Sequence, residues 1–212
     1  MTNNDYRYSK YEEKNANVIM DKLAFAKKLN SEHPTTNNHY RFISENVGPY
    51  KLQYLKIFDN KCVYCGNSLQ NLSVYLFEID HYINKASFDD LVEEHANHID
   101  NLYPACKICN SKKSGITFMN EYVTLFKPDS NIQNIFYRDD QYNIKIQEQY
   151  LNDIFVNKFY NKLKLNHDAR RLDYLLLCMR GLADKTKNSN LSKELIMLIN
   201  SLQEKRNYIV LS

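Results

Sequence analysis

The segment CKICNSKK at residues 106–113 contains two cysteines separated by two residues, and CVYC at residues 62–65 contains another such pair. Forty residues lie between the two pairs. Cysteines with this spacing can bind one metal ion from a single tight turn, and two such turns complete the four-sulfur shell of a structural zinc site. A single pair is also typical of a redox-active dithiol, but two pairs together favour zinc. We therefore predict one structural Zn²⁺ bound by Cys62, Cys65, Cys106 and Cys109.

The residues between the two pairs predict a strand, a helix and a second extended segment. SVYLFEID at 73–80 is rich in β-branched and aromatic residues, which predicts a strand that ends at Asp80 and His81. SFDDLVEEHANHI at 87–99 has the pattern of a short helix. NLYPACKICNSKKSG at 101–115 begins as an extended segment and passes into a helix that carries the second cysteine pair. The zinc site would join the two ends of this unit.

In this order and spacing, the residues resemble the HNH endonucleases, whose core is a ββα-metal fold. The resemblance covers residues 61–115, about a quarter of the chain. The matching residues are Cys62, Cys65, Asp80, His81, Asn101, Leu102, Cys106, Cys109, Asn110 and Lys113. The resemblance implies an α+β protein in which a ββα-metal core, held by the four-cysteine zinc site, is embedded in a mostly α-helical chain.

The resemblance also implies hydrolysis of DNA phosphodiester bonds with one catalytic Mg²⁺ or Mn²⁺. A neutral histidine can accept a proton from water at physiological pH, so His81 is the expected general base. Magnesium prefers oxygen ligands and keeps several waters, so Asp80 would supply a carboxylate and Asn110 an amide oxygen. Because adjacent strand residues point to opposite faces, the metal and the base would flank the scissile phosphate.

Three further residues receive supporting roles from the resemblance. Asn101 would hold the loop and the general base in place, and Lys112 or Lys113 would contact a phosphate. Each residue type also has a simpler explanation, because such side chains at strand ends, in turns and on helices are usually structural or solvated. A zinc-stabilised module that binds nucleic acid or protein without catalysis is therefore the alternative to an enzyme.

Outside this segment the sequence predicts mainly helices. We expect a helical segment at 1–48, the nuclease core at 49–120 and a C-terminal region at 121–212. In the last region NIFYRDDQYNIKI predicts a β-hairpin, because its apolar residues alternate on both sides of a polar turn. Three helices should follow the hairpin, at 148–165, 168–182 and 191–206.

The segment LKLNHDARRLDYLLLCMR at 163–180 follows the expected hairpin. A hairpin and then an arginine-containing helix after an HNH core resembles the HNH subunits of bacterial anti-phage systems of the Septu and retron type. Such a subunit pairs with an ATPase, so Arg170 and Arg171 would face a partner or DNA; on an ordinary amphipathic helix they would lie in water. A stand-alone restriction or toxin nuclease is a further alternative. Cys178 is expected to be a small buried apolar residue.

Charge and hydropathy exclude few functions. The formal net charge of +3 is compatible with a nucleic-acid partner but does not require one. The apolar run LLLCM at 175–179 is far too short to cross a membrane. The first residues, MTNNDYRYSKYEEK, lack the apolar region of a secretory signal. We therefore expect a cytoplasmic protein that does not contact a membrane.

Overall fold

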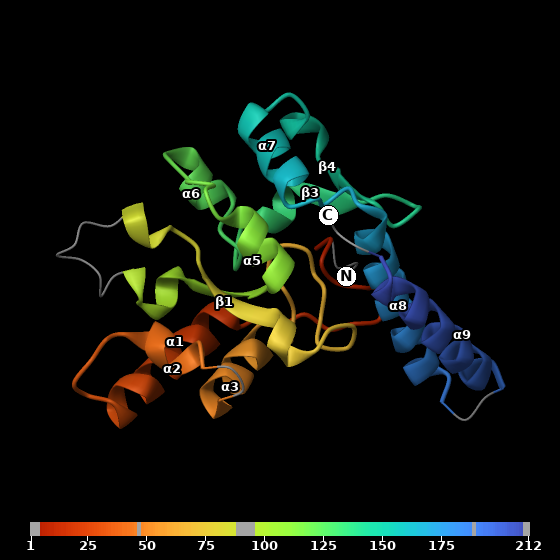
Figure 1. Cartoon of the computed structure of the whole chain (residues 1–212), viewed down its shortest axis with the longest axis horizontal. Coiled ribbons are helices and arrows are strands. Elements are labelled where there is room, and N and C mark those ends of the chain that lie inside the picture. The colour runs from red at the N-terminus through yellow and green to blue at the C-terminus, as the bar shows by residue number, and fades with distance from the viewer. Residues whose placement is uncertain (1–4, 46–47, 88–95, 188–189, 210–212) are drawn as a thin grey trace. The chain divides into compact units, whose positions relative to one another are not determined.

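The computed structural model describes residues 5–45, 48–87, 96–187 and 190–209. Helices and two small antiparallel sheets form a mixed α+β architecture, as the sequence predicts (Figure 1). The chain divides into two compact units. Unit 1 comprises Met1–Lys14, Cys65–Leu72 and Gln133–Ser212, and unit 2 comprises Asn15–Tyr64 and Ser73–Ile132. The division at 1–48, 49–120 and 121–212 stays a prediction. Among the described residues, no helix combines the length and apolar character needed to span a membrane.

The centre of unit 2 is a pair of antiparallel strands with a helix packed against it. β1 (Phe77–His81) pairs with β2 (Leu102–Cys106) in a register that places Asp80 opposite Tyr103. α5 (Lys107–Lys113) follows β2 without a loop and packs against both strands (Figure 1). The predicted ββα arrangement is therefore present, and Asp80 lies next to the last residue of β1.

The first strand is shorter than the sequence predicts. Val74–Leu76 form a 3₁₀ turn (η1), because the Ser73 side chain accepts a hydrogen bond from the Tyr75 backbone N–H and caps this turn. Most of the helix expected at 87–99 lies outside the described residues. On either side of that gap, the chain forms short 3₁₀ turns at η2 (Lys85–Ser87) and η4 (Ile99–Asn101).

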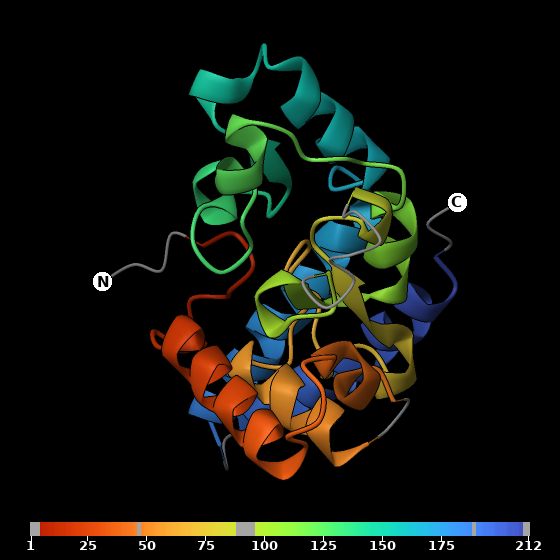
Figure 2. The ribbon, with the colours of Figure 1, turned by 90° about the vertical axis from the view of Figure 1, so that its left-hand side faces the viewer.

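The described part of unit 2 contains further helices. They are α1 (Val18–Glu32), α2 (His39–Ile43), α3 (Pro49–Ile57) and α6 (Glu121–Leu125). α1 and α2 both pack against α3, and Figure 2 shows the three helices as one cluster at the red-to-orange end of the chain. This cluster buries Phe25, Leu29, Ile43, Tyr54 and Leu55.

The turn after α3 positions the first cysteine pair. Asp59 and Asn60 adopt φ values of 54° and 57°, a left-handed conformation that these two residue types tolerate better than most. The Val63 backbone N–H then donates to the Pro104 carbonyl at 3.0 Å. This hydrogen bond fixes the first cysteine turn to β2, so the two pairs meet at one end of the strands.

Unit 1 contains a β-hairpin and the C-terminal helices. β3 (Phe136–Arg138) pairs with β4 (Ile144–Ile146), which confirms the predicted hairpin. Around it are η5 (Ile132–Asn134), η6 (Glu148–Tyr150), α7 (Ile154–Lys162), α8 (Asp168–Lys185) and α9 (Asn190–Asn207). The first helix after the hairpin starts six residues later than expected, because the Asp153 carboxylate accepts the Val156 N–H and caps it there. α8 and α9 pack against each other around Leu176, Met179, Ala183 and Ile199.

The N-terminal residues of unit 1 pack on elements that come much later in the chain. The Tyr6 ring makes an edge contact with Phe136 of β3, and Arg138 donates to the Tyr6 carbonyl at 2.8 Å. Gly66, with φ 76°, approaches the Arg7 backbone so closely that an added Cβ would lie 2.6 Å from its Cα. Both the left-handed conformation and the close approach require glycine at this position.

Candidate active site and metal centre

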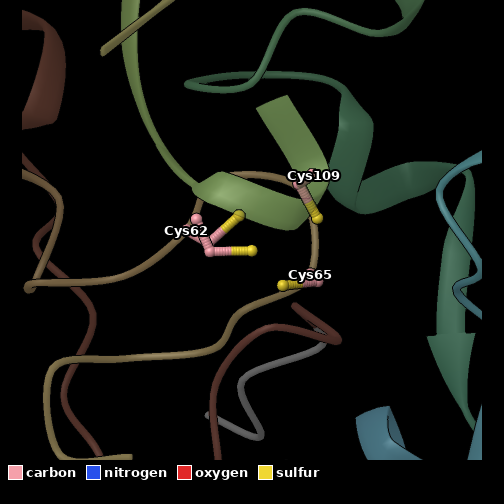
Figure 3. Close-up of side chains that lie close together, drawn as sticks. Cys62, Cys65 and Cys109 are labelled. Carbon is pink, nitrogen blue, oxygen red and sulfur yellow. The ribbon is translucent and has the colours of Figure 1, made fainter. Parts of the chain in front are cut away.

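The four predicted zinc ligands lie together. Each cysteine is buried, and their sulfur atoms all lie within 4.8 Å of one another. Figure 3 shows the sulfurs of Cys62, Cys65 and Cys109 pointing toward a common centre. A tetrahedral zinc ion with Zn–S bonds of about 2.3 Å separates its sulfurs by about 3.8 Å. The thiol positions therefore fit one ion with small adjustments, and the closed four-sulfur shell would make it structural.

A buried arginine contacts one of these sulfurs. Nη1 of Arg170, on α8, donates to Sγ of Cys65 at 3.0 Å, and the Arg170 side chain is 1% exposed. Two residues after Cys65, the Asn67 side chain donates to Asp173, and Asp173 also forms an ion pair with Arg206. The expectation that Arg170 faces water or a partner is therefore wrong, whereas Arg171 is exposed. No local sequence signal distinguishes the two arginines, because the contact joins residues 105 positions apart.

Asp80 is buried and lies in an ion pair. Its exposed fraction is 6%, and its carboxylate accepts from Tyr64 Oη at 2.5 Å and from Lys113 Nζ at 3.0 Å. Burial raises the pKa of Asp80 and lowers the pKa of Lys113, and the charge of each partner opposes these shifts. Burial also holds the pKa of Tyr64 well above its ordinary value, so this hydroxyl remains a donor.

The structure places the two predicted phosphate-contacting lysines differently. Lys113 is 1% exposed and donates to both Asp80 and the His81 carbonyl, so it faces the interior of unit 2. Lys112 is only half-buried. Lys112 therefore has the surface position and Lys113 the buried one. Adjacent side chains of α5 point to different sides because an α-helix turns by about 100° per residue.

His81 is held by two neighbours. Its Nε2 lies 2.9 Å from Oδ1 of Asn97, and its ring lies 4.4 Å from the Tyr40 ring. With a carbonyl oxygen as the partner, Nε2 carries the proton and Nδ1 is the unprotonated atom. Burial lowers the pKa of His81, while the Asn97 hydrogen bond and the Asp80 charge oppose this shift. A neutral imidazole with one basic nitrogen is the form that a general base needs.

Asn101 joins the two ends of the segment that follows β1. Its Oδ1 accepts from the Ile83 N–H at 2.7 Å, and its Nδ2 donates to the carbonyls of Ile83 and Ala96 at 2.9 Å each. Its own carbonyl accepts from the Tyr82 N–H. These contacts fix the chain immediately after His81, and a role of Asn101 in holding the general base stays a prediction.

Asn110 lies on the face of α5 that packs on β1, and its hydrogen-bond partner there is Glu78. Its Nδ2 donates to Oε2 of Glu78 at 2.7 Å. Glu78 and Asp80 are two residues apart on β1, so their side chains lie on the same face of the strand. The sequence did not single out Glu78, Tyr64 or Asn97. Of these three residues, only Glu78 could have been found from the sequence, because an acidic residue two positions before Asp80 lies on the same face of the strand.

The comparisons with known proteins agree with this geometry. Residues 62–115 match the family model for HNH endonucleases, which confirms the resemblance for this segment. No solved structure matches the chain.

Two curated proteins are similar over part of their length. Septu protein PtuB of Bacillus thuringiensis is 42% identical over 66 residues, 31% of this chain and 24% of that protein. The protein named as HNH endonuclease YoqL, from the SPbeta prophage of Bacillus subtilis (strain 168), is 35% identical over 65 residues, 31% of this chain and 28% of that protein. The matched segment thus spans about a quarter of the length of these relatives.

Proposed function

We propose that this chain, whose residues 62–115 match the HNH endonucleases, is a metal-dependent endonuclease that hydrolyses DNA phosphodiester bonds. The observation that carries the proposal is the position of Asp80 and His81 at the end of β1, beside α5 and its Asn110, in a chain whose two CxxC pairs form a four-sulfur cluster. A binding module needs the zinc cluster but has no need for a buried carboxylate beside a histidine with one basic nitrogen.

The residues fit a divalent cation. A carboxylate has about four lone-pair sites, so the contacts of Asp80 with Tyr64 and Lys113 leave acceptor capacity. The Asn110 amide donates through its nitrogen, which leaves its oxygen as a possible ligand. A Mg²⁺ or Mn²⁺ ion at these oxygens would neutralise phosphate charge and stabilise the leaving oxygen.

The chain's own groups supply the remaining steps. His81 accepts a proton from the attacking water through Nδ1, because Nε2 is bound to Asn97. Asn101 holds the backbone after His81, so the imidazole approaches the water in a fixed orientation. Of the two lysines that the resemblance implies, Lys112 is the one with a surface position from which it can contact a phosphate. Replacing Lys112 should reduce the slope of log K for DNA binding against log salt concentration by about one, because one phosphate contact is lost.

Cleavage of DNA tests the enzymatic proposal. Supercoiled plasmid, phage DNA and RNA are incubated with the zinc-loaded protein, with and without Mg²⁺ or Mn²⁺. We expect metal-dependent nicking or cleavage of DNA with 5′-phosphate and 3′-hydroxyl ends, and its loss in His81→Ala. His33→Ala, at another half-buried histidine of unit 2, is the matched control. DNA binding without cleavage in the wild type would favour the non-catalytic zinc module, and the opposite end polarity would contradict a metal on the leaving oxygen.

The similarity to Septu protein PtuB supports a role in anti-phage defence with an ATPase as partner. We expect the chain to reduce phage plating only when it is expressed with such an ATPase, and the two proteins to co-purify. Protection by the chain alone would favour a stand-alone restriction nuclease, and growth arrest without phage would favour a toxin.

A further inference from the structure

Glu78 is a charged side chain that the reaction described above does not use. It lies on β1, two residues before Asp80 and on the same face, and it is half-buried. Its partner on β2 is Ala105. The α5 helix packs against β1 here and brings Asn110 within hydrogen-bond distance of Glu78, with Nδ2 2.7 Å from Oε2.

This contact fixes the orientation of the Asn110 amide. A carboxylate is only an acceptor, and the NH₂ group of an amide is only a donor. The nitrogen of Asn110 must therefore face Glu78, and Oδ1 must face the other way. An asparagine without such a partner can turn its amide by 180° and present either atom. Mg²⁺ and Mn²⁺ take oxygen ligands, so only one of the two orientations is useful for binding them.

We propose that Glu78 is a positioning residue that holds Nδ2 of Asn110, so that Oδ1 is presented to the divalent metal. The inference rests on the proposed function, because it takes Asn110 as a metal ligand. The same logic recurs at His81, where the contact of Nε2 with Asn97 selects the tautomer that is unprotonated at Nδ1. Partners that orient metal ligands typically contribute a factor of 10–100 in metal affinity.

Mn²⁺ binding without DNA measures this role independently of catalysis. The protein is first loaded with zinc, and free Mn²⁺ is then followed by electron paramagnetic resonance during a titration. We expect Glu78→Ala to weaken Mn²⁺ binding about tenfold. Glu78→Gln keeps a carbonyl acceptor for Asn110 without the charge, so its Mn²⁺ affinity should stay within about threefold of the wild type. Zinc content and circular dichroism verify that each variant is folded.

Exchanging the carboxylate and the amide between residues 78 and 110 gives a second test. Asn110→Asp offers a better metal ligand in isolation, but the new carboxylate would face Glu78 and be repelled. We therefore expect Asn110→Asp to bind Mn²⁺ more weakly than the wild type. In the double variant Glu78→Gln with Asn110→Asp, the glutamine amide can donate to the new carboxylate. Mn²⁺ affinity should then return to at least the wild-type value.

The outcomes separate this inference from the proposed function. If Asn110→Ala binds Mn²⁺ as well as the wild type, Asn110 is not a ligand, and both the metal assignment and the role of Glu78 fail. If Asn110→Ala weakens binding but Glu78→Ala does not, only the role of Glu78 fails. Equal losses in Glu78→Gln and Glu78→Ala would show that Glu78 acts through its charge, on the metal or on the nearby Lys51, which also overturns positioning. As a direct readout, the side-chain NH₂ resonances of Asn110 should shift in Glu78→Ala and much less in Glu78→Gln.

Discussion

Nζ of Lys113 lies 3.0 Å from Oδ2 of Asp80, and both side chains are almost fully buried. The same ammonium group donates to the His81 carbonyl at 2.9 Å. A charge buried in this way is costly unless its partner is present, so each member of the pair stabilises the ionised form of the other. Lys113 therefore acts inside the site, as the group that keeps a buried carboxylate charged beside the proposed metal position.

Removal of the Lys113 charge should destabilise unit 2. We expect Lys113→Met to lower the free energy of unfolding by about 3–5 kcal/mol, because it leaves the Asp80 carboxylate buried without its cation. Urea denaturation measures the change. Lys112→Met, at the adjacent half-buried position, is the control and should change the free energy by less than about 0.5 kcal/mol. Equal changes in the free energy of unfolding for the two substitutions would show that the buried ion pair does not stabilise unit 2.

Asn97 should affect the rate of cleavage more than the binding of DNA. It is 2% exposed and holds Nε2 of His81, so Asn97→Ala frees the imidazole to rotate and to change tautomer. We expect kcat to fall by about tenfold or more and KM to change by less than about twofold, since a positioned general base contributes about 10²–10⁴. Steady-state kinetics on a defined duplex separates the two constants. A rise in KM at constant kcat would instead assign Asn97 to substrate binding.

The nitrogen chemical shifts of His81 provide a structural readout for the same variant. In the wild type we expect ¹⁵N shifts typical of a neutral ring protonated at Nε2. In Asn97→Ala the two shifts should move toward each other as the tautomers mix. Unchanged shifts would show that Asn97 does not select the tautomer.

Arg170 should affect retention of zinc. Its guanidinium donates to Sγ of Cys65, and a charge-assisted hydrogen bond stabilises a thiolate relative to a thiol. We expect Arg170→Met to release zinc to a competing chelator at about tenfold lower chelator concentration than the wild type. Arg171→Met, at the exposed neighbouring position, should behave like the wild type. Identical zinc affinity in all three proteins would contradict a role of Arg170 at the metal.

His39 should make stability depend on pH below neutrality. It is fully buried, its Nδ1 accepts the Ile99 N–H at 3.0 Å, and its Nε2 lies 2.7 Å from Oδ1 of Asn30. Burial, with a smaller contribution from the nearby His98, lowers the pKa of His39 to about 4. The unfolded chain therefore binds a proton between pH 6.5 and pH 4 that the folded chain does not. The contribution of His39 is complete above pH 6.5 and is lost as the pH falls through this window.

The size of this effect follows from the shift of the pKa. The difference in the pKa of His39 between the folded and unfolded states corresponds to a change of about 3 kcal/mol at most in the free energy of unfolding. Urea denaturation at several pH values should show a shallower pH dependence between 4 and 6.5 in His39→Gln than in the wild type. Parallel curves for the two proteins would show that another group is responsible.

The parts of the site that local sequence determines were predictable. Cysteines two residues apart must share a turn, so both pairs were found from spacing alone, and the four sulfurs do lie together. The strand ending near Asp80 and the hairpin at residues 136–146 also follow from short patterns that the structure confirms. These features depend on contacts within a few residues or across one strand pair.

The environment of each site residue was not predictable, because it depends on contacts between distant segments. Lys113 appeared as a surface lysine on a helix, yet the packing of α5 on β1 brings it to a carboxylate 33 residues away. Arg170 appeared as one of two equivalent arginines, yet only its position on α8 allows contact with a cysteine. Asn97 had no pattern at all, because its partner His81 is defined only once the chain between them has folded back.

The discontinuity of unit 1 has a consequence for biosynthesis. Residues 5–14 leave the ribosome before the rest of unit 1, and their partners Phe136, Arg138 and Tyr174 are made more than a hundred residues later. All of unit 2 has been synthesised before these partners are made. Unit 2 can therefore fold during translation, whereas residues 5–14 remain without their partners. Pairings over such long separations form slowly. A bulky fusion at the N-terminus would therefore hinder the last step of maturation more than the first.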